Sequence, residues 1–351
     1  GKEFDRLRLI DLEGRPVYVL HGFDNSIRTI DAKSGKLIDL LKKNVAEKIA
    51  EKFSEIATLK VEGPIDYDQW IVPNRYDPYR PFYRVSLKDE NKTILYVSAR
   101  TGEVLQKTEY SERAWNYFGA VTHWIYPIVL RKNWALWDQV VWWLSLSGVI
   151  TTGAGLWLGI IRWRDSKGGK LKRTTSPFKG WLRAHHILGL LVGIFVLTWI
   201  FSGWLSMDHG RLFSKPNPKP DQIKKFRSIS IAQAIENISL EALSSLDSFR
   251  EGEIFSMGGN PFVIIRNAKE QKLFEPTDSH SLSSVKFKES EVINAVKEAW
   301  PNSKVQSTER PGKSDAYGKL REGSLPPNTL RVILEDPLQT WVHVDMDSGQ
   351  I

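Results

Sequence analysis

The chain has 351 residues, more than a single ordinary domain, and carries a net charge of +8 with no cysteine. The absence of cysteine excludes disulfides, cysteine-ligated metal sites and thiol chemistry. The basic balance could suggest nucleic acid, but much of the excess lies in one loop beside apolar segments. A membrane surface explains such a loop, so no nucleic-acid partner is expected.

The first arm of the chain predicts a hairpin, a helix and a second hairpin. Residues 17–38 alternate in polarity and contain the turn sequence Asp31-Ala-Lys-Ser-Gly35, which is typical of a β-hairpin. A short amphipathic helix follows, and after a proline-rich stretch comes a second hairpin at 83–105. The residues expected on one face of the helix are Val45, Ile49 and Phe53.

Two uncharged apolar strips occupy the middle of the chain. They are Val140–Ile161, with 22 residues, and Ile187–Met207, with 21. Each reaches the ~20 residues that a helix needs to cross ~30 Å of hydrocarbon. The alternative is a pair of core helices in a soluble domain, but such helices normally carry a polar stripe. The strips therefore predict a transmembrane helical hairpin.

The residues around the strips predict its orientation. The loop between them is rich in lysine and arginine, which places it in the cytoplasm and both arms outside. Eleven of the 14 tryptophans lie from Trp115 to Trp204, as in an aromatic belt at both membrane interfaces. The basic residues of the loop are Arg162, Arg164, Lys167, Lys170, Lys172, Arg173, Lys179 and Arg183.

The second arm repeats the first at a constant offset of 247 residues, without a gap. We expect residues 15–105 and 262–351 to share one fold, an antiparallel sheet covered by a helix. In the second copy the helix face is Val292, Val296 and Trp300, and the last turn is Asp345-Met-Asp-Ser-Gly349. Identical pairs include Asp31 and Asp278, Asp89 and Asp336, Thr93 and Thr340, and Gly102 and Gly349.

This hairpin–helix–hairpin unit, with its D-x-x-[ST]-G turns, resembles the PepSY domain. Two such units around a basic-looped helix pair resemble the bacterial PepSY-associated transmembrane (PepSY-TM) proteins. The most family-like stretches are Arg183–Gly189 and Trp199–Met207. The resemblance implies an α+β membrane protein, with a transmembrane helical hairpin flanked by two PepSY-like antiparallel sheet-plus-helix modules. It also implies a multi-pass protein of the bacterial inner membrane, with both modules on the periplasmic side.

The predicted segments follow one another along the chain. A first module is expected at 1–110, an interfacial aromatic segment at 111–137 and a membrane helix at 138–163. A basic cytoplasmic loop at 164–183, a second membrane helix at 184–208 and a second module at 209–351 complete the chain. The repeat and the family pattern lead us to expect a further helix before Gly1 and another after Ile351, giving four in the parent protein.

Four histidines lie in or beside the predicted membrane, where imidazole is costly to bury and often marks function. His185 and His186 are adjacent, so their side chains point ~100° apart and only one can face a given cofactor. His186 shares its face with Gly189 and Gly193, where small residues let a macrocycle or another helix approach. The glycines are equally explained as a helix-packing G-x-x-x-G, and the histidines as neighbours of lipid headgroups.

The other two histidines lie at the opposite membrane face. His123 falls in the aromatic segment, and His209 follows the second strip, where Asp208-His209-Gly210 can equally be a polar helix end. His123 and His186 are separated by about 30 Å of helix, so they cannot hold one iron. If haem b is present, they predict two haems, an inner one at His186 and an outer one at His123. The second ligand of the outer haem would be His209 or a histidine of a further helix, and that of the inner haem would come from a further helix.

Some members of the family are reductases of ferric siderophores that carry b-type haem. The resemblance therefore implies a haem-dependent reductase passing electrons to a ferric siderophore outside the cytoplasm. Its electron donor would be a quinol, a flavoprotein or another protein, because no nucleotide-binding or nucleophile motif is visible. No catalytic residue is assigned, and enzymatic activity stays open. The alternatives are a non-enzymatic protein that binds peptide or protein partners, and an accessory subunit of a metal-uptake system.

Overall fold

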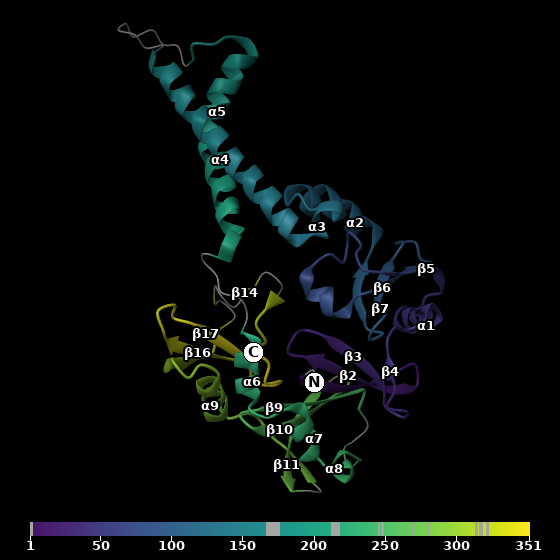
Figure 1. The fold of residues 1–351 in the computed structure, drawn as a ribbon. Coiled ribbons are helices and arrows are strands. Elements are labelled where there is room, and N and C mark those ends of the chain that lie inside the picture. Colours follow the sequence, from purple (N-terminus) through teal and green to yellow (C-terminus); the bar gives the residue numbers. More distant parts are fainter. Residues whose placement is uncertain are drawn as a thin grey trace. The chain divides into compact units, whose positions relative to one another are not determined.

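The structure, a computed structural model, divides into two compact units. It describes residues 3–165, 176–211, 218–244, 246, 249–268, 270–278, 281–312, 315, 319–320 and 323–351. The sheet unit contains Gly1–Asp66, Pro73–Glu109 and Asn217–Ile351. The helix unit contains Tyr67–Val72 and Tyr110–Pro216. The protein is thus α+β, as predicted, with its strands in one unit and its long helices in the other (Figure 1).

An eight-stranded antiparallel sheet runs through the sheet unit, in the order β12-β11-β10-β9-β1-β2-β3-β4. It combines strands from both arms of the sequence, because β1 pairs with β9. The strands are β1 (Phe4–Leu12), β2 (Arg15–Gly22), β3 (Ile27–Asp31), β4 (Leu37–Ile38), β9 (Glu251–Met257), β10 (Asn260–Arg266), β11 (Gln271–Asp278) and β12 (Ser281–Ser284).

The junction between β1 and β9 relates the two halves of this sheet by a local two-fold axis. Leu7 pairs with Ile254, and these two residues are equivalent under the 247-residue offset. Because the pairing is antiparallel, residues after Leu7 on β1 pair with residues before Ile254 on β9. The two copies therefore complete one sheet by pairing their first strands.

Each arm also has a smaller antiparallel sheet with a helix against it. In the first arm, α1 (Lys43–Ser54) packs on a four-stranded sheet with the strand order β5-β6-β7-β8. In the second arm, α9 (Glu289–Ala299) packs on a three-stranded sheet with the strand order β13-β16-β17. These strands are β5 (Thr58–Ile65), β6 (Phe82–Leu87), β7 (Ile94–Ser98), β8 (Val104–Thr108), β13 (Lys304–Glu309), β16 (Thr329–Glu335) and β17 (Trp341–Asp345). The unit also contains η1 (Asn74–Tyr79), α6 (Pro220–Arg227), α7 (Ile231–Glu236), α8 (Leu240–Ser244), β14 (Lys319–Leu320) and β15 (Gly323–Ser324).

Matched contacts confirm the repeat. The same arginine–glutamate pair joins the strands of both small sheets, at 2.7 Å in the first and 2.6 Å in the second. In the next turn of each copy, a threonine N–H donates to an aspartate at 2.8 Å. The pairs are Arg84–Glu62 with Arg331–Glu309, and Thr93–Asp89 with Thr340–Asp336. Each equivalent residue is 247 positions further on, so the two arms share local geometry as well as element order.

The predicted helix face holds in the second arm and is partly wrong in the first. Val292 and Val296 of α9 are fully buried, as expected. In α1 the buried residues are Ala46 and Ala50, whereas Phe53 is 59% exposed. The physical reason is that the small alanines turn toward the sheet, which rotates Phe53 to the solvent side of the helix.

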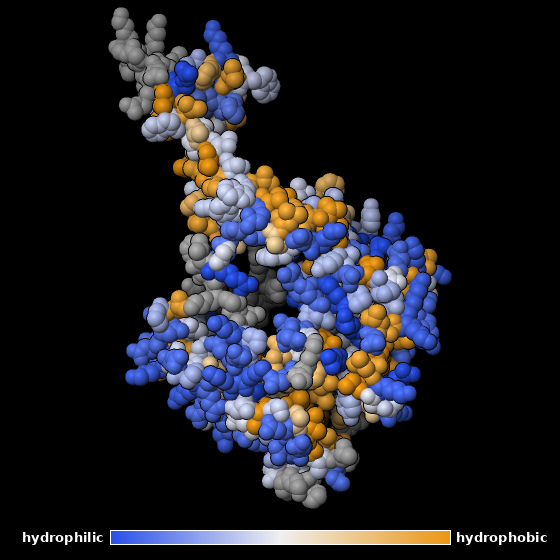
Figure 2. All heavy atoms as spheres, in the orientation of Figure 1, coloured by the Kyte–Doolittle hydropathy of each residue, from blue (hydrophilic) through white to orange (hydrophobic). Residues whose placement is uncertain are grey.

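Two long helices dominate the helix unit and pack along one another. Both are long and apolar enough to cross a membrane, and Figure 2 shows that the side chains along them are mostly hydrophobic. They are α4 (Trp134–Asp165) and α5 (Gly180–Ser206). Both begin several residues before the predicted membrane segments, because the helical backbone continues past the uncharged strips. The shorter helices are α2 (Tyr110–Asn116), η2 (Tyr117–Val121), α3 (Ile128–Arg131) and η3 (His209–Arg211).

The aromatic segment before α4 is held against the start of that helix. The Trp137 indole N–H donates to the carbonyl of Ile125 at 2.9 Å, and the Arg131 guanidinium lies 4.3 Å from the ring centre of Trp134. Such contacts fix aromatic rings at the end of an apolar helix. The central residues of the predicted basic loop, including Lys170, lie outside the described residues, whereas Arg183 is described and exposed.

Candidate functional site

His186 is buried between α4 and α5, and both of its ring nitrogens have partners. Nε2 lies 2.9 Å from the carbonyl oxygen of Gly159, and Nδ1 lies 2.9 Å from the hydroxyl of Ser176. A carbonyl oxygen only accepts, so Nε2 carries the proton and, in the neutral ring, Nδ1 accepts from the serine. The ring of Phe178 packs edge-on at 5.3 Å. His186 is therefore a satisfied interhelical residue in this arrangement.

Leucine side chains fill the space beside two of the glycines near His186, Gly193 and Gly159. A Cβ at Gly193 would come within 2.8 Å of Leu156, and one at Gly159 within 2.9 Å of Leu190. A Cβ at Gly189 would meet nothing within 4 Å. The distances at Gly159 and Gly193 describe close packing of one helix on the other. They support the helix-packing explanation for Gly193 but not for Gly189, the other glycine of the predicted G-x-x-x-G.

The residues at His186 do not fit haem ligation as they stand. Iron needs a free imidazole nitrogen, and one would become available only after the bond to Gly159 or to Ser176 is broken. A macrocycle would also have to displace Leu156 and Leu190. Haem binding stays a prediction from the family resemblance, and the geometry at His186 does not support it.

The remaining predicted histidines occupy three different settings. His185 is exposed on α5, one residue from the buried His186. His123 is also exposed, and its ring centre lies 6.2 Å from that of Trp199. His209 Nδ1 lies 2.5 Å from a carboxylate oxygen of Asp138, at the other end of the helix pair from His186. Within the described residues, no group of three or more histidine or acidic side chains is placed to hold a metal ion.

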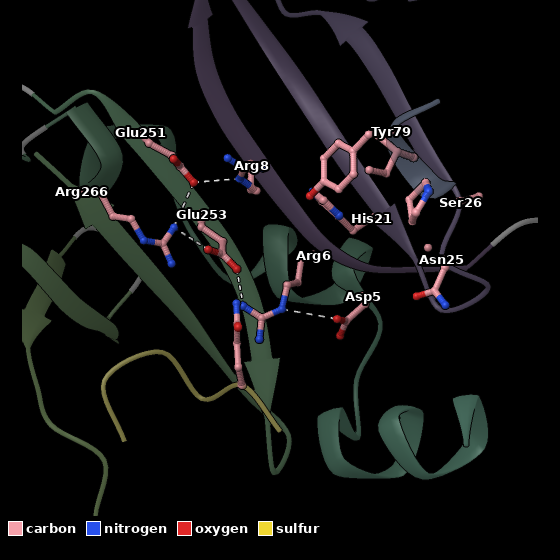
Figure 3. Close-up of a pocket in the computed structure, with 14 residues that line it drawn as sticks. Asp5, Arg6, Arg8, His21, Asn25, Ser26, Tyr79, Glu251, Glu253 and Arg266 are labelled. Carbon is pink, nitrogen blue, oxygen red and sulfur yellow. Dashed lines mark hydrogen bonds and ion pairs between the residues drawn. The ribbon is translucent and has the colours of Figure 1, made fainter. Parts of the chain in front are cut away.

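A charged cavity lies in the sheet unit at the junction of β1 and β9, and we name it the seam cavity (Figure 3). It has a volume of about 490 Å³, which falls within the usual range for small-molecule sites. One side is formed by β1, β9 and β10, and the other by β2, the turn after it, the start of β3 and η1. The lining residues that carry the argument are Asp5, Arg6, Arg8, His21, Ser26, Tyr79, Glu251, Glu253 and Arg266.

Ion pairs connect the two halves of the sheet across this cavity. Arg6 of β1 bonds to Glu253 of β9, while Arg8 bonds to Glu251 at 2.8 Å. Arg266 of β10 contacts both glutamates, at 3.0 and 2.6 Å (Figure 3). Burial opposes ionisation of Glu253, but Arg6 and Arg266 outweigh it, so the pKa of this carboxyl is lowered. Glu253 is therefore ionised at neutral pH, although it is buried.

Among the residues that the structure describes, three buried polar atoms of the cavity lining have no hydrogen-bond partner. They are Nη2 of Arg6, Nε2 of His21 and Oγ of Ser26. Burial, followed by the nearby charge of Arg8, lowers the pKa of His21, so the ring is neutral at pH 7. Burial also raises the pKa of Tyr79, which keeps its phenol protonated. A buried polar atom without a partner is uncommon in a folded protein and indicates a place for a ligand or water.

The sequence reasoning missed this cavity because it assigned the first hairpin to residues 17–38 and overlooked β1. A signal was available in the repeat, because Arg6 is equivalent to Glu253 under the 247-residue offset. Opposite charges at equivalent positions of two copies indicate that the copies meet there.

No known protein family and no curated protein matches the sequence. Among solved structures, the chain has a slight likeness to the crystal structure of a protein described as a lipoprotein, from Clostridium difficile 630. Identity is 19%, the match covers 31% of this chain and 82% of that one, and the TM-score is 0.16. A likeness of this size carries no argument about fold or function.

Proposed function

We propose that the protein is a membrane-anchored binding protein. In this proposal α4 and α5 cross the bacterial inner membrane as a helical hairpin, with the basic loop in the cytoplasm. The sheet unit, with its two PepSY-like modules, lies outside the cytoplasm and binds its ligand at the seam cavity. The observation that carries the proposal is the set of buried, unpartnered polar atoms in that cavity.

The anchoring role is supported by the surface of the helix pair. Large apolar side chains point away from both helices, including Trp157 at 68% exposure and Phe195 at 70%. At 1.5 Å per residue, α4 and α5 are roughly 48 and 40 Å long, more than the ~30 Å of a hydrocarbon core. Water would leave this apolar area unfavourably hydrated, and lipid tails would not.

The competing proposal is the haem-dependent reductase of ferric chelates. The observation that favours it is the placement of histidines at both ends of the helix pair, His186 at one and His209 at the other. His186 would have to exchange its present partners for iron, so the binding function needs fewer changes to the observed geometry. An accessory role beside a metal transporter is a special case of the binding function.

The side of the membrane on which each segment lies is tested by cysteine labelling. The chain has no cysteine, so each introduced thiol is the only one that can react. Single cysteines are introduced at the exposed Ser284 of β12 and at the exposed Lys179 before α5. In cells whose outer membrane alone is permeabilised, a membrane-impermeant maleimide should label Ser284→Cys at once. It should label Lys179→Cys only after the inner membrane is broken. The opposite pattern would overturn the orientation.

Spectroscopy of the purified protein distinguishes a binding protein from a haem-dependent reductase. A reduced-minus-oxidised absorption spectrum of the protein in detergent should show no b-type haem that depends on His186. A stoichiometric haem signal that disappears in His186→Ala, but not in His185→Ala, would overturn the proposal and favour the reductase. The adjacent His185 is the matched control because it is exposed and lies one residue away.

A further inference from the structure

We propose that the seam cavity binds the carboxylate group of its ligand, either a small organic acid or the C-terminus of a peptide. This inference rests on the proposed binding function and names the chemistry of that site. It follows from counting which polar atoms of the cavity already have partners and which do not.

The acceptors of the lining are occupied. Each of its three carboxylates contacts two arginines. Asp5 contacts Arg6 and Arg227, at 3.4 and 2.6 Å. Glu251 and Glu253 share Arg266, and each has a second arginine from β1. A cationic ligand would therefore have to displace an arginine to reach a carboxylate.

The groups without partners can donate hydrogen bonds. The Arg6 side chain is only 9% exposed, and its Nη2 has no partner among the described residues. The Ser26 hydroxyl is also unpaired, and His21 Nε2 can carry a proton in the neutral ring. Glu103 Oε2 is a buried acceptor without a partner, but Glu103 is not among the lining residues. The lining thus offers donors, and a ligand must bring acceptor oxygens.

The charge of the lining favours a ligand with one negative charge over a ligand with two. Three arginines and three carboxylates line the cavity, so its formal charge is zero when His21 is neutral. A carboxylate oxygen can accept a charge-assisted hydrogen bond from the Arg6 N–H, and the ligand then brings only one negative charge close to Asp5 and Glu253. A phosphate dianion would bring two. Tyr79 and Ser26 lie across from Arg6 and can bond the second oxygen (Figure 3).

The test is calorimetric titration of the full chain in detergent with four probes. They are N-acetyl-trialanine with a free carboxylate, the same peptide as its C-terminal amide, propionate, and inorganic phosphate. The peptide with a free carboxylate, or propionate, should bind. Tighter binding of the peptide would identify a peptide C-terminus as the ligand, and tighter binding of propionate would identify a small organic acid. The amide should bind at least about tenfold more weakly than the free peptide, because it lacks the charge-assisted bond.

Variants keep the result specific to the cavity. Tyr79→Phe and Ser26→Ala each remove one hydroxyl and should weaken carboxylate binding by about 3- to 10-fold. Tyr18→Phe on β2 and Ser284→Ala on β12 are matched controls outside the lining and should bind as the wild type does. Arg6→Met should abolish binding, but it also breaks the ion pairs with Asp5 and Glu253, so the two hydroxyl variants are the ones that test the site.

Three outcomes would overturn the inference. Equal binding of the amide and the free peptide would remove the carboxylate as the recognised group, and preferential phosphate binding would replace it with another anion. No binding of any probe at about 10 mM would leave no site of useful affinity. None of these results bears on membrane sidedness or haem, so the anchoring part of the proposed function is judged separately.

Discussion

Removing Glu253 should destabilise the sheet unit more than any surface substitution. This side chain is 2% exposed and holds Arg6 and Arg266, which come from opposite sides of the β1–β9 junction. Removing one partner of a buried ion pair costs about 3–5 kcal/mol, because the other charge stays buried. Arg6 keeps Asp5, and Arg266 keeps Glu251, so we expect the lower end, about 3 kcal/mol.

The assay is thermal unfolding of the purified full chain in detergent, followed by near-ultraviolet circular dichroism. For a unit of this size, 1 kcal/mol shifts Tm by about 2–4 °C, so Glu253→Ala should lower the sheet unit's Tm by about 6–12 °C. Glu90→Ala, at an exposed turn, is the matched control and should change little. The Arg6→Ala/Glu253→Ala pair should show a coupling of at least about 1 kcal/mol. A Glu253→Ala shift no larger than the control's would refute this account of the junction.

Three further predictions concern single positions. Gly193→Ala should weaken the packing of α4 on α5, because its Cβ would lie 2.8 Å from a leucine, whereas Gly189→Ala should not; thermal unfolding of the helix unit distinguishes them. Gly102→Ala should destabilise the first arm by about 2–4 kcal/mol, since the residue has φ +76° and a Cβ would meet packed side chains; an unchanged Tm would contradict this. Because the pKa of His21 is lowered in the folded protein, the unfolded chain binds an extra proton below about pH 6.5, and the free energy of unfolding falls as the pH drops. His21→Gln should reduce this pH dependence, measured by unfolding from about pH 7.5 to 5, and an unchanged dependence would contradict the assignment.

Much of the fold could be predicted because its patterns are local. The turn at Asp31 has the expected serine and backbone N–H groups bonded to its carboxylate. The two uncharged strips form long helices, since each has about twenty mostly apolar residues and contains no proline. The face of α1 was misjudged because the periodicity did not distinguish Ala46 and Ala50 from their larger neighbours, and the sheet selected the alanines.

The candidate site was harder to predict because it depends on pairing between distant segments. Nothing local to Arg6 indicates that it meets Glu253, and only the repeat carries that information. For His186 the sequence left two explanations open, a ligand and a packing residue. The choice depended on whether Gly159 presented its carbonyl to the ring, and such a contact between two helices has no signature in either helix alone.

The central claim is that a ligand-binding cavity lies outside the cytoplasm on a membrane-anchored protein. Its most direct test is the labelling of a Gln350→Cys variant, whose new thiol lies at an exposed position of the seam-cavity lining. In cells with only the outer membrane permeabilised, an impermeant maleimide should modify the thiol, and a carboxylate that binds the cavity should slow the reaction. Modification that requires rupture of the inner membrane, or a rate that no carboxylate changes, would contradict the account.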